Sequence, residues 1–294
     1  MDSRSTAHGR IVAITGANTG IGFATAIGLA RQGAHIAMIC RDAARGHSAM
    51  RAVAAVASSP PDLFIADLAS QESIRELVEQ LHRQLPRIDV LINNAGAAFA
   101  TRAVTVDGIE RTFAVNHLAP FLLTTSALDL IRASSQGRII NVTAGIPVPR
   151  SSLLDNLQGE RRYTQFGAYR TSKVSNILFT YELARRLEGT AITVNCAHPG
   201  PVRTEFMRTA GGALAFMSKI AWPLMKSAEA GARTPIYLAS APDVAAITGG
   251  YFVNCRRRRS ASITYDRGIA AKLWEISDQL TRSNSTHARA IDRC

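Results

Sequence analysis

The chain has 294 residues, 47% of them hydrophobic and 19% charged, which is enough apolar material for the core of one large globular domain. No apolar run approaches the roughly 18 consecutive residues that cross a bilayer, and the polar N-terminus lacks the apolar stretch of a signal peptide. The four cysteines show neither paired nor metal-type spacing, so we expect free thiols and no metal site. Together these features predict a cytoplasmic protein without a transmembrane anchor.

The chain is strongly basic, with a formal net charge of +12 and only four lysines among its 34 basic residues. Such a charge is typical of a solvated surface, or of attraction to anions such as a phosphorylated cofactor or an acidic partner. The dense run Arg256-Arg257-Arg258-Arg259 has a role that the sequence leaves open. Because no aromatic residues are interleaved with it and no nucleic-acid-binding module is recognisable, we expect no nucleic-acid partner.

Short apolar runs alternate with helical patterns along the chain. Runs typical of buried strands occupy residues 10–15, 34–40, 63–66, 88–92, 137–142, 191–196 and 250–254. Helical patterns extend from a glycine turn to about residue 32, and then occupy 43–57, 70–84, 107–133, 168–188 and 227–240. Continuous apolar strands that alternate with helices are typical of a parallel sheet covered on both faces.

This pattern predicts an α/β fold, a Rossmann-type doubly wound parallel sheet of about seven strands with helices on both faces. We expect a single domain over residues 10–282, because no linker or repeat interrupts the pattern. The polar ends, residues 1–9 and 283–294, are expected to be flexible.

A glycine-rich turn, Thr15-Gly-Ala-Asn-Thr-Gly-Ile-Gly22, joins the first predicted strand to the first predicted helix. Glycines let the backbone turn tightly and approach a pyrophosphate, and the helix N-terminus supplies amide donors. Between a strand and a helix of an α/β chain, this motif indicates a dinucleotide site far more strongly than glycine spacing alone. The residues expected to bind the cofactor here are Gly16, Asn18, Thr19, Gly20, Ile21 and Gly22.

The end of the second predicted strand bears on the choice between NADP(H) and NAD(H). An acidic side chain there would bind the ribose 2′-hydroxyl, whereas the guanidinium of Arg41 can clamp a 2′-phosphate. The neighbouring Asp42 could instead turn inward and favour NAD(H). We expect NADP(H) to be favoured over NAD(H).

Polar and small residues follow the third and fourth predicted strands. The carboxylate of Asp67 can accept a hydrogen bond from the adenine amino group, and the small residues of Asn93-Asn-Ala-Gly96 leave room for the adenosine ribose. From these two strand ends we expect cofactor contacts by Asp67, Leu68, Asn94, Ala95 and Gly96.

Tyr169 and Lys173 are four residues apart at the beginning of a predicted helix, which places both side chains on one face. An ammonium beside a phenol favours the phenolate, so we expect Lys173 to lower the pKa of Tyr169 from its reference of about 10. Such a couple would exchange protons near neutral pH.

With these motifs in this order, the sequence resembles the short-chain dehydrogenase/reductase family over nearly the whole chain. The resemblance is carried by the glycine turn, Asp67, Asn93–Gly96, Asn116, Tyr169-x-x-x-Lys173 and Pro199-Gly200 with Thr204. Segments such as Val115-Asn-His-Leu118 and Cys196-Ala-His-Pro-Gly200 are similar to the retinol-dehydrogenase-like branch, although the membrane anchor common in that branch is not found in this sequence.

The resemblance implies a role for each matching residue. Tyr169 would be the acid/base that exchanges a proton with the alcohol or carbonyl oxygen, and Lys173 would hold the nicotinamide ribose. Asn116 would hold a water that links Lys173 to solvent, or would only relieve a bend in its helix. The rest of the cofactor site would be completed by Pro199, Gly200, Val202 and Thr204.

The chain departs from the family at the residue that polarises the substrate carbonyl. The family uses the second of two small residues after the fifth strand, usually serine, and here those residues are Thr143 and Ala144. Three interpretations stay open. In the first, the hydroxyl of Thr143, Ser151 or Ser152 replaces that of the serine. In the second, the enzyme is a slower reductase that relies on Tyr169. In the third, the scaffold catalyses a non-redox reaction such as cyclisation, dehydration or isomerisation, or only binds cofactor as a regulator.

The segment near 205–226 takes the place of the family's substrate lid, and its many large apolar residues predict a hydrophobic small-molecule substrate. The alternative is that this segment packs on a membrane surface or a second subunit. The sequence thus predicts an NADP(H)-dependent oxidoreductase of a hydrophobic ketone, aldehyde or alcohol, consistent with secondary metabolism. The resemblance also implies a homodimer or homotetramer paired through 107–133 and 168–188, and we interpret His117 and His198 as structural.

Overall fold

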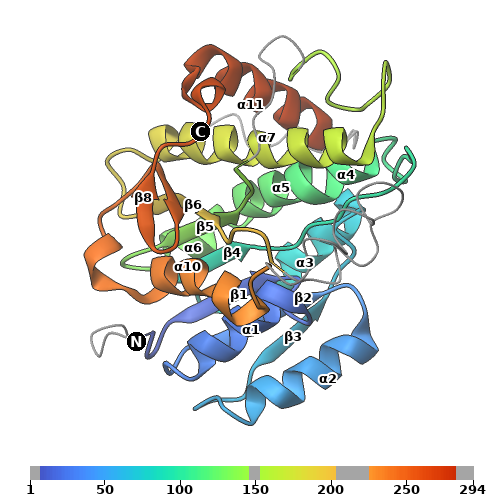
Figure 1. Cartoon of the computed structure of the whole chain (residues 1–294). Coiled ribbons are helices and arrows are strands. Elements are labelled where there is room, and N and C mark those ends of the chain that lie inside the picture. Colours follow the sequence, from blue (N-terminus) through green and yellow to red (C-terminus); the bar gives the residue numbers. More distant parts are fainter. Residues whose placement is uncertain (1–6, 146–152, 203–224, 283–294) are drawn as a thin grey trace, which may run out of the picture.

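The computed structural model describes residues 7–145, 153–202 and 225–282 (Figure 1). At its centre lies an eight-stranded sheet with the strand order β3-β2-β1-β4-β5-β6-β7-β8. The strands are β1 (Ile11–Thr15), β2 (His35–Cys40), β3 (Asp62–Ile65), β4 (Val90–Asn93), β5 (Arg138–Val142), β6 (Thr193–His198), β7 (Gly250–Val253) and β8 (Arg256–Arg258). All neighbouring strands are parallel except β7 and β8, which confirms the predicted doubly wound sheet.

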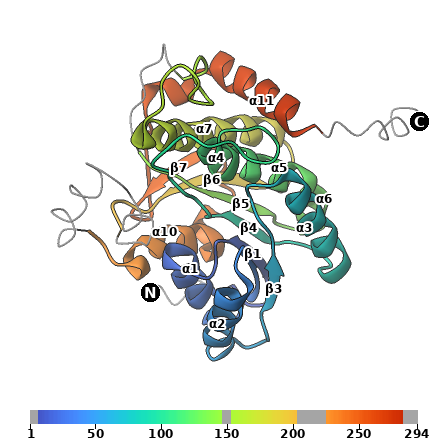
Figure 2. The same ribbon diagram turned by 90° about the vertical axis from the view of Figure 1, so that its right-hand side faces the viewer.

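Helices cover both faces of the sheet, as Figures 1 and 2 show. They are α1 (Gly20–Ala30), α2 (Ala43–Ala54), α3 (Gln71–Gln84), α4 (Arg111–Phe113), α5 (Ala119–Ser126), α6 (Leu128–Arg132), α7 (Gln165–Arg186), α10 (Ala228–Ser240) and α11 (Arg267–Thr281). Successive residues of β1 serve opposite faces, since Val12 packs with α1, α2 and α10, whereas Ala13 packs with α3, α5 and α7. This two-sided burial explains why the strands are almost wholly apolar.

The sheet has one strand more than the seven runs that the sequence predicted. β8 pairs antiparallel with β7 after a tight turn in which Asn254 and Cys255 both have positive φ, of 52° and 60°. Positive φ at both central residues is the geometry of a hairpin turn that matches strand twist. The three residues of β8 are exposed arginines, so its sequence carries no apolar pattern by which it could be predicted.

The predicted helix over 107–133 is broken into pieces. α4 passes into a π-helical turn, η1 (Ala114–Leu118), and α5 and α6 follow with a break at Ala127. Pro120 lies in the first turn of α5 and has no amide hydrogen, so it cannot continue the ordinary hydrogen bonds of the preceding turn. The π turn takes up this mismatch.

Helix α11 was not among the predicted helices, and it lies along the outer side of α7 (Figures 1 and 2). Its Trp274 packs against Phe121 and Phe179, with ring centroids 4.9 and 5.9 Å away. The guanidinium carbon of Arg186 lies 4.1 Å from the centre of the Trp274 ring. The face predicted to pair subunits is therefore partly covered by the chain itself.

Residues 7–9, which precede the predicted domain start at residue 10, pack against the rest of the chain. Ala7 is fully buried, and its amide donates to the carbonyl of Gln32 at 3.2 Å. The amide of Gly9 donates to Gly33 at 3.3 Å. Residues 7–9 thus contact the segment that follows α1, while the flexibility of the N-terminus stays a prediction. The expected flexible tail, 283–294, lies outside the described residues.

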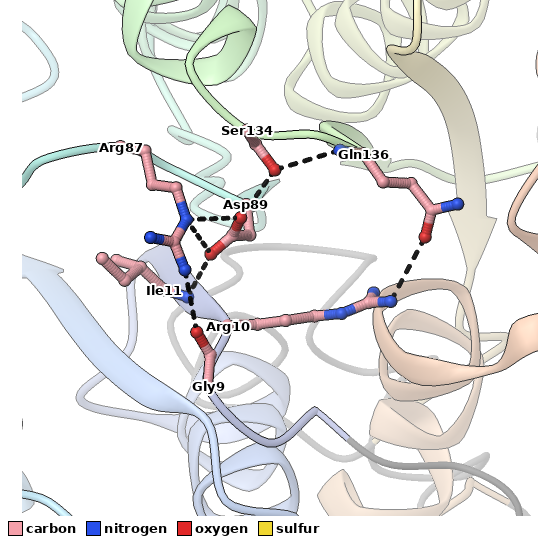
Figure 3. Close-up of polar contacts among 7 residues, drawn as sticks. All are labelled: Gly9, Arg10, Ile11, Arg87, Asp89, Ser134 and Gln136. Carbon is pink, nitrogen blue, oxygen red and sulfur yellow. Dashed lines mark hydrogen bonds and ion pairs between the residues drawn. The ribbon is translucent and has the colours of Figure 1, made fainter.

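Asp89 ties together the amino ends of β1 and β4, at the sheet edge opposite the strand ends that carry the predicted motifs (Figure 3). Its carboxylate accepts hydrogen bonds from the Ile11 amide at 2.8 Å, from Arg87 at 2.9 and 3.0 Å and from Ser134 at 2.6 Å. Burial acts to raise the pKa of Asp89, but these hydrogen bonds outweigh it, and the pKa is lowered.

The substitution Asp89→Asn is expected to lower the free energy of unfolding by about 1–3 kcal/mol at neutral pH, because a buried acceptor set loses its charge. Since the pKa of Asp89 is lower in the folded chain, its contribution is present above about pH 4 and is lost as pH falls through the folded pKa. Urea denaturation of both proteins at neutral and acidic pH should show the difference closing in acid. The exposed Asp155→Asn serves as control, and a difference that does not change with pH would contradict this assignment.

Candidate active site

A cavity of about 630 Å³ lies at the carboxyl ends of the parallel strands. It opens beside β1, where the strand order reverses between β2 and β4, the usual position of ligands in doubly wound sheets. Predicted site residues that line it are Gly16, Asn18, Thr19, Gly20, Ile21, Arg41, Asp67, Leu68, Asn94, Ala95, Gly96, Thr143, Tyr169, Lys173 and Pro199. Gly22, Asn116, Gly200 and Val202 are not among the lining residues, and Thr204 lies outside the described residues.

The glycine turn is packed too closely for larger residues. Gly16 has a φ of +66°, and its amide donates to the carbonyl of Ile39 at 2.8 Å. A side chain at Gly22 would collide with the Gly16 carbonyl and the Asn94 amide. No side chain caps α1 at Thr19, so amides of the first helical turn stay available at the cavity for an anionic group.

Two arginines stand at the cavity beyond β2. Asp42 accepts a hydrogen bond from the Arg45 amide at 2.9 Å and thereby caps the N-terminus of α2. One oxygen of its carboxylate is engaged at the helix end, and Asp42 also lines the cavity. Arg41 and Arg45 both line the cavity, and Arg45 was missed because only the first turn of α2 brings it to the cavity.

Tyr169 and Lys173 lie on the first turns of α7, as predicted. Thr164 caps this helix by accepting from the Gly167 amide at 3.0 Å, which fixes where the helix begins. The Lys173 ammonium donates to the carbonyl of Val142 at 3.0 Å and lies 5.8 Å from the centre of the Tyr169 ring. The end of β5 and the beginning of α7 are thus joined at the cavity.

Burial, rather than the charge of Lys173, decides the proton affinities of this couple. Burial raises the pKa of Tyr169 to about 12 and lowers the pKa of Lys173 to about 8. The first shift is opposite in direction to the lowering that the sequence predicted, because burial penalises the phenolate. The ammonium of Lys173 bonds to the Val142 carbonyl and lies 5.8 Å from the ring centre. The phenol is therefore protonated at neutral pH.

Asn116 lies in η1 and is fully buried behind the cavity wall. Its side-chain oxygen accepts from the Ala97 amide at 2.7 Å, and its amide donates to the Ala97 carbonyl at 2.8 Å and the Ser172 hydroxyl at 2.9 Å. These contacts brace the wall formed by Ala97 against α7. They agree with the interpretation of Asn116 as a residue of a helix bend, and the water that it was expected to hold stays a prediction.

The hydroxyl of Thr143 does not simply replace the serine. It is buried and donates its proton to the main-chain carbonyl of Lys173 at 2.7 Å. Ala144 is half-buried and offers no donor. The other two candidates, Ser151 and Ser152, lie outside the described residues.

A hydroxyl that sequence reasoning missed lies near this position. A side chain placed on Gly145 would come within 2.5 Å of the Tyr251 hydroxyl oxygen, so that phenol lies against the residue after Ala144. Tyr251 is on β7 and stacks on His198 with ring centroids 6.0 Å apart. Burial raises the pKa of Tyr251, so it keeps its proton. No local sequence motif predicts this position of Tyr251, because only the pairing of β6 with β7 brings it beside Gly145.

The segment after β6 carries three predicted cofactor residues. Pro199 lines the cavity, and Gly200 has a φ of +83° with the Lys226 ammonium beside its backbone. Val202 pairs with Lys226 in a parallel bridge and is buried. The lid predicted near 205–226 lies largely outside the described residues.

The structure also bears on metal ligands and on membrane-spanning helices. Among the described residues, no cluster of three or more histidine, cysteine or acidic side chains is arranged to hold a metal ion. Over the same parts of the chain, no helix is both long and apolar enough to cross a membrane.

Comparison with known proteins agrees with this geometry. The family model described as short chain dehydrogenase matches residues 10–213. Human retinol dehydrogenase 14 is 41% identical over 288 residues, covering 92% of this chain and 86% of that protein. A protein of Streptomyces sp. (strain C5), named "Putative daunorubicin C-13 ketoreductase DnrU", is 42% identical over 270 residues, covering 92% of this chain and 91% of that protein.

Solved structures show the same fold. The Pseudomonas aeruginosa RhlG/NADP active-site complex has a TM-score of 0.70 and 26% identity, covering 86% of this chain and 97% of that chain. The family model and the retinol dehydrogenase relatives together span the sheet, the glycine turn and α7. The chain therefore belongs to the short-chain dehydrogenase/reductase family of oxidoreductases, in its retinol-dehydrogenase-like branch.

Proposed function

We propose that the protein is an NADP(H)-dependent oxidoreductase that transfers hydride between nicotinamide and a hydrophobic ketone or aldehyde, or the corresponding alcohol. The observation that carries the proposal is that one cavity brings together the glycine turn, Arg41 and the couple of Tyr169 and Lys173. Relatives named as a retinol dehydrogenase and a ketoreductase support an alcohol or carbonyl as the substrate.

The residues present fit a phosphorylated dinucleotide. The place of a side chain on Gly22 is taken by the Gly16 carbonyl and the Asn94 amide, so only glycine fits this turn. No side chain caps the first turn of α1, whose amides can bind a pyrophosphate. Arg41 and Arg45 offer two guanidinium groups to a 2′-phosphate, while Asp42 is held at the end of α2. The remaining contacts are proposed for Asn18, Thr19, Gly20, Ile21, Asp67, Leu68, Asn94, Ala95, Gly96, Pro199, Gly200, Val202 and Thr204.

The chain's own chemistry is proton transfer and orientation. When bound, the nicotinamide supplies or accepts the hydride at the substrate carbon. Tyr169, protonated at neutral pH, donates a proton to the carbonyl oxygen and takes it back from an alcohol. Lys173 holds the nicotinamide ribose in this proposal, and Thr143 locks the Lys173 carbonyl to the end of β5.

The wider setting of the enzyme belongs to the same proposal. We infer a cytoplasmic protein with a role in secondary metabolism, and a lid near 205–226 that accepts an apolar substrate. A homodimer or homotetramer formed at the face of α7 would have to include α11 in its contact, because α11 packs on α7.

Ala144 supports an alternative to the redox proposal, in which the same scaffold is a non-redox enzyme or a regulator that binds cofactor. Without a serine at that position, Tyr169 is the proposed donor to the substrate oxygen, and a redirected reaction would need only the proton-transfer couple. The alternative predicts a product without consumption of reduced cofactor, or cofactor binding without any product.

The first test is Tyr169→Phe, assayed with NADPH and a panel of bulky carbonyl compounds by cofactor absorbance and product mass. Loss of the acid/base is expected to lower kcat by about 10²–10⁴-fold, with NADPH affinity retained. Tyr237→Phe is the control, because its hydroxyl bonds to Asp243 on the face that α10 covers. Product formed with no NADPH oxidised would overturn the redox proposal in favour of its alternative.

A second prediction concerns the cofactor phosphate. The double variant Arg41→Ala with Arg45→Ala is expected to weaken NADPH binding by at least about tenfold, since charge-assisted hydrogen bonds are lost. NADH binding should change little. Fluorescence titration measures both affinities, with the exposed Arg51→Ala on the same helix as control. Equal weakening for both cofactors would contradict a 2′-phosphate contact.

A third prediction restores the missing hydroxyl. Ala144→Ser is expected to raise kcat for a ketone by up to about 10²–10³-fold, the size of effect produced by one preorganised donor to a developing oxyanion. Ala98→Ser, which places a hydroxyl elsewhere on the cavity wall, is the matched control. An unchanged rate in the Ala144→Ser enzyme would mean that a donor already acts there or that none is needed, and substitution of Tyr251 would separate these two cases.

A further inference from the structure

A buried chain of hydrogen bonds runs from α11 to Asn116. The Ser277 hydroxyl oxygen on α11 lies 2.9 Å from Nε2 of His117, and Nδ1 of His117 lies 3.0 Å from the side-chain oxygen of Asn176. The Asn176 amide then donates to the main-chain carbonyl of Asn116 at 2.7 Å. All four residues are at most 1% exposed. The chain joins segments 160 residues apart.

The Asn116 carbonyl needs a side-chain donor because of the local sequence. In an α-helix this carbonyl would accept from the amide four residues on, but that residue is Pro120, which has no amide hydrogen. Asn176 supplies the missing donor from α7. A buried carbonyl left unpaired would be costly, so the orientation of the Asn176 amide is dictated by Asn116.

The orientation of Asn176 in turn fixes the tautomer of His117. With its amide nitrogen at Asn116, Asn176 presents an oxygen to the ring, and an oxygen of this kind can only accept. Nδ1 of His117 must therefore carry the proton. Burial lowers the pKa of His117 to about 4, so the ring is neutral and its Nε2 is an acceptor. The single proton of the Ser277 hydroxyl is shared between two acceptors, Nε2 at 2.9 Å and the Leu273 carbonyl at 2.7 Å.

The side chain of Asn116 connects these hydrogen bonds to the cavity wall. Its side chain holds both polar groups of Ala97 and bonds to Ser172, the residue before Lys173. Its oxygen and the Lys173 ammonium also lie 3.5 and 3.2 Å from the place where a side chain on Gly96 would be. A rotation of η1 would move the cavity wall and disturb its contact with α7.

We propose that His117 is a positioning residue, which holds η1 in register through Asn176 so that Asn116 keeps the cavity wall and Lys173 in their working geometry. Ser277 anchors the ring from α11. The inference rests on the proposed function only in assigning Lys173 and the wall of Ala97 to the reacting site. It gives His117 and α11 a part in the reaction, beyond packing.

Two amide substitutions at His117 distinguish its hydrogen bond to Asn176 from its hydrogen bond to Ser277. The side-chain nitrogen of His117→Asn takes the place of Nδ1 and can still donate to Asn176, whereas that of His117→Gln takes the place of Nε2 and reaches only Ser277. We expect His117→Gln to lose between about 10- and 100-fold in kcat with little change in KM for the carbonyl substrate, as for misplaced catalytic groups. His117→Asn should retain most of the activity.

Leu77→Ala, in the core between α3 and the sheet, is the control for a loss of stability alone. Thermal melting measures the loss of stability in this variant and in the His117 variants. The same variants are also titrated with NADPH by fluorescence, which requires no turnover, and weaker binding is expected in His117→Gln alone. If the unmodified enzyme reduces no carbonyl compound, the proposed function fails, while the titration still decides the role of His117. Equal losses in both amide variants, or in neither, would overturn the positioning role.

Discussion

The site depends on the junction between Lys173 and the end of β5. The ammonium of Lys173 donates to the Val142 carbonyl, and its own main-chain carbonyl accepts from the hydroxyl of Thr143. One residue of α7 is thus held at two points, to the last residue of β5 and to the residue that follows it. Because β5 lies in the middle of the sheet, the helix that carries Tyr169 is fixed relative to the cavity. Buried, charge-assisted hydrogen bonds of this kind hold geometry more firmly than apolar contact alone.

Much of this arrangement could be predicted from the sequence because it depends on local patterns. The glycine turn stands between a strand and a helix, and only small residues fit where Gly22 meets the Gly16 carbonyl. The spacing of Tyr169 and Lys173 is that of one helical face, and the structure places both at the cavity. Strand ends of a parallel sheet meet at one edge, which is why motifs far apart in sequence could be expected together.

What could not be predicted comes from contacts between distant segments. The rise in the pKa of Tyr169 depends on its burial at the cavity wall, whereas the spacing of four residues shows only that an ammonium is near. Tyr251 reaches Gly145 through strand pairing, and α11 finds its place by packing Trp274 against Phe121 and Phe179. The break in the 107–133 helix had a local signal in Pro120, but proline near a helix start is also ordinary.

The arginines of β8 have a consequence for the chain in a crowded solution. β8 is the last strand of the described sheet, so its outer edge carries unpaired main-chain groups that could template pairing with another chain. A second copy that approached edge to edge would bring the Arg256–Arg258 segments together, and like charges directly opposite repel. The charge of this run thus disfavours edge-to-edge pairing of two copies, and neutral residues in its place would remove that repulsion.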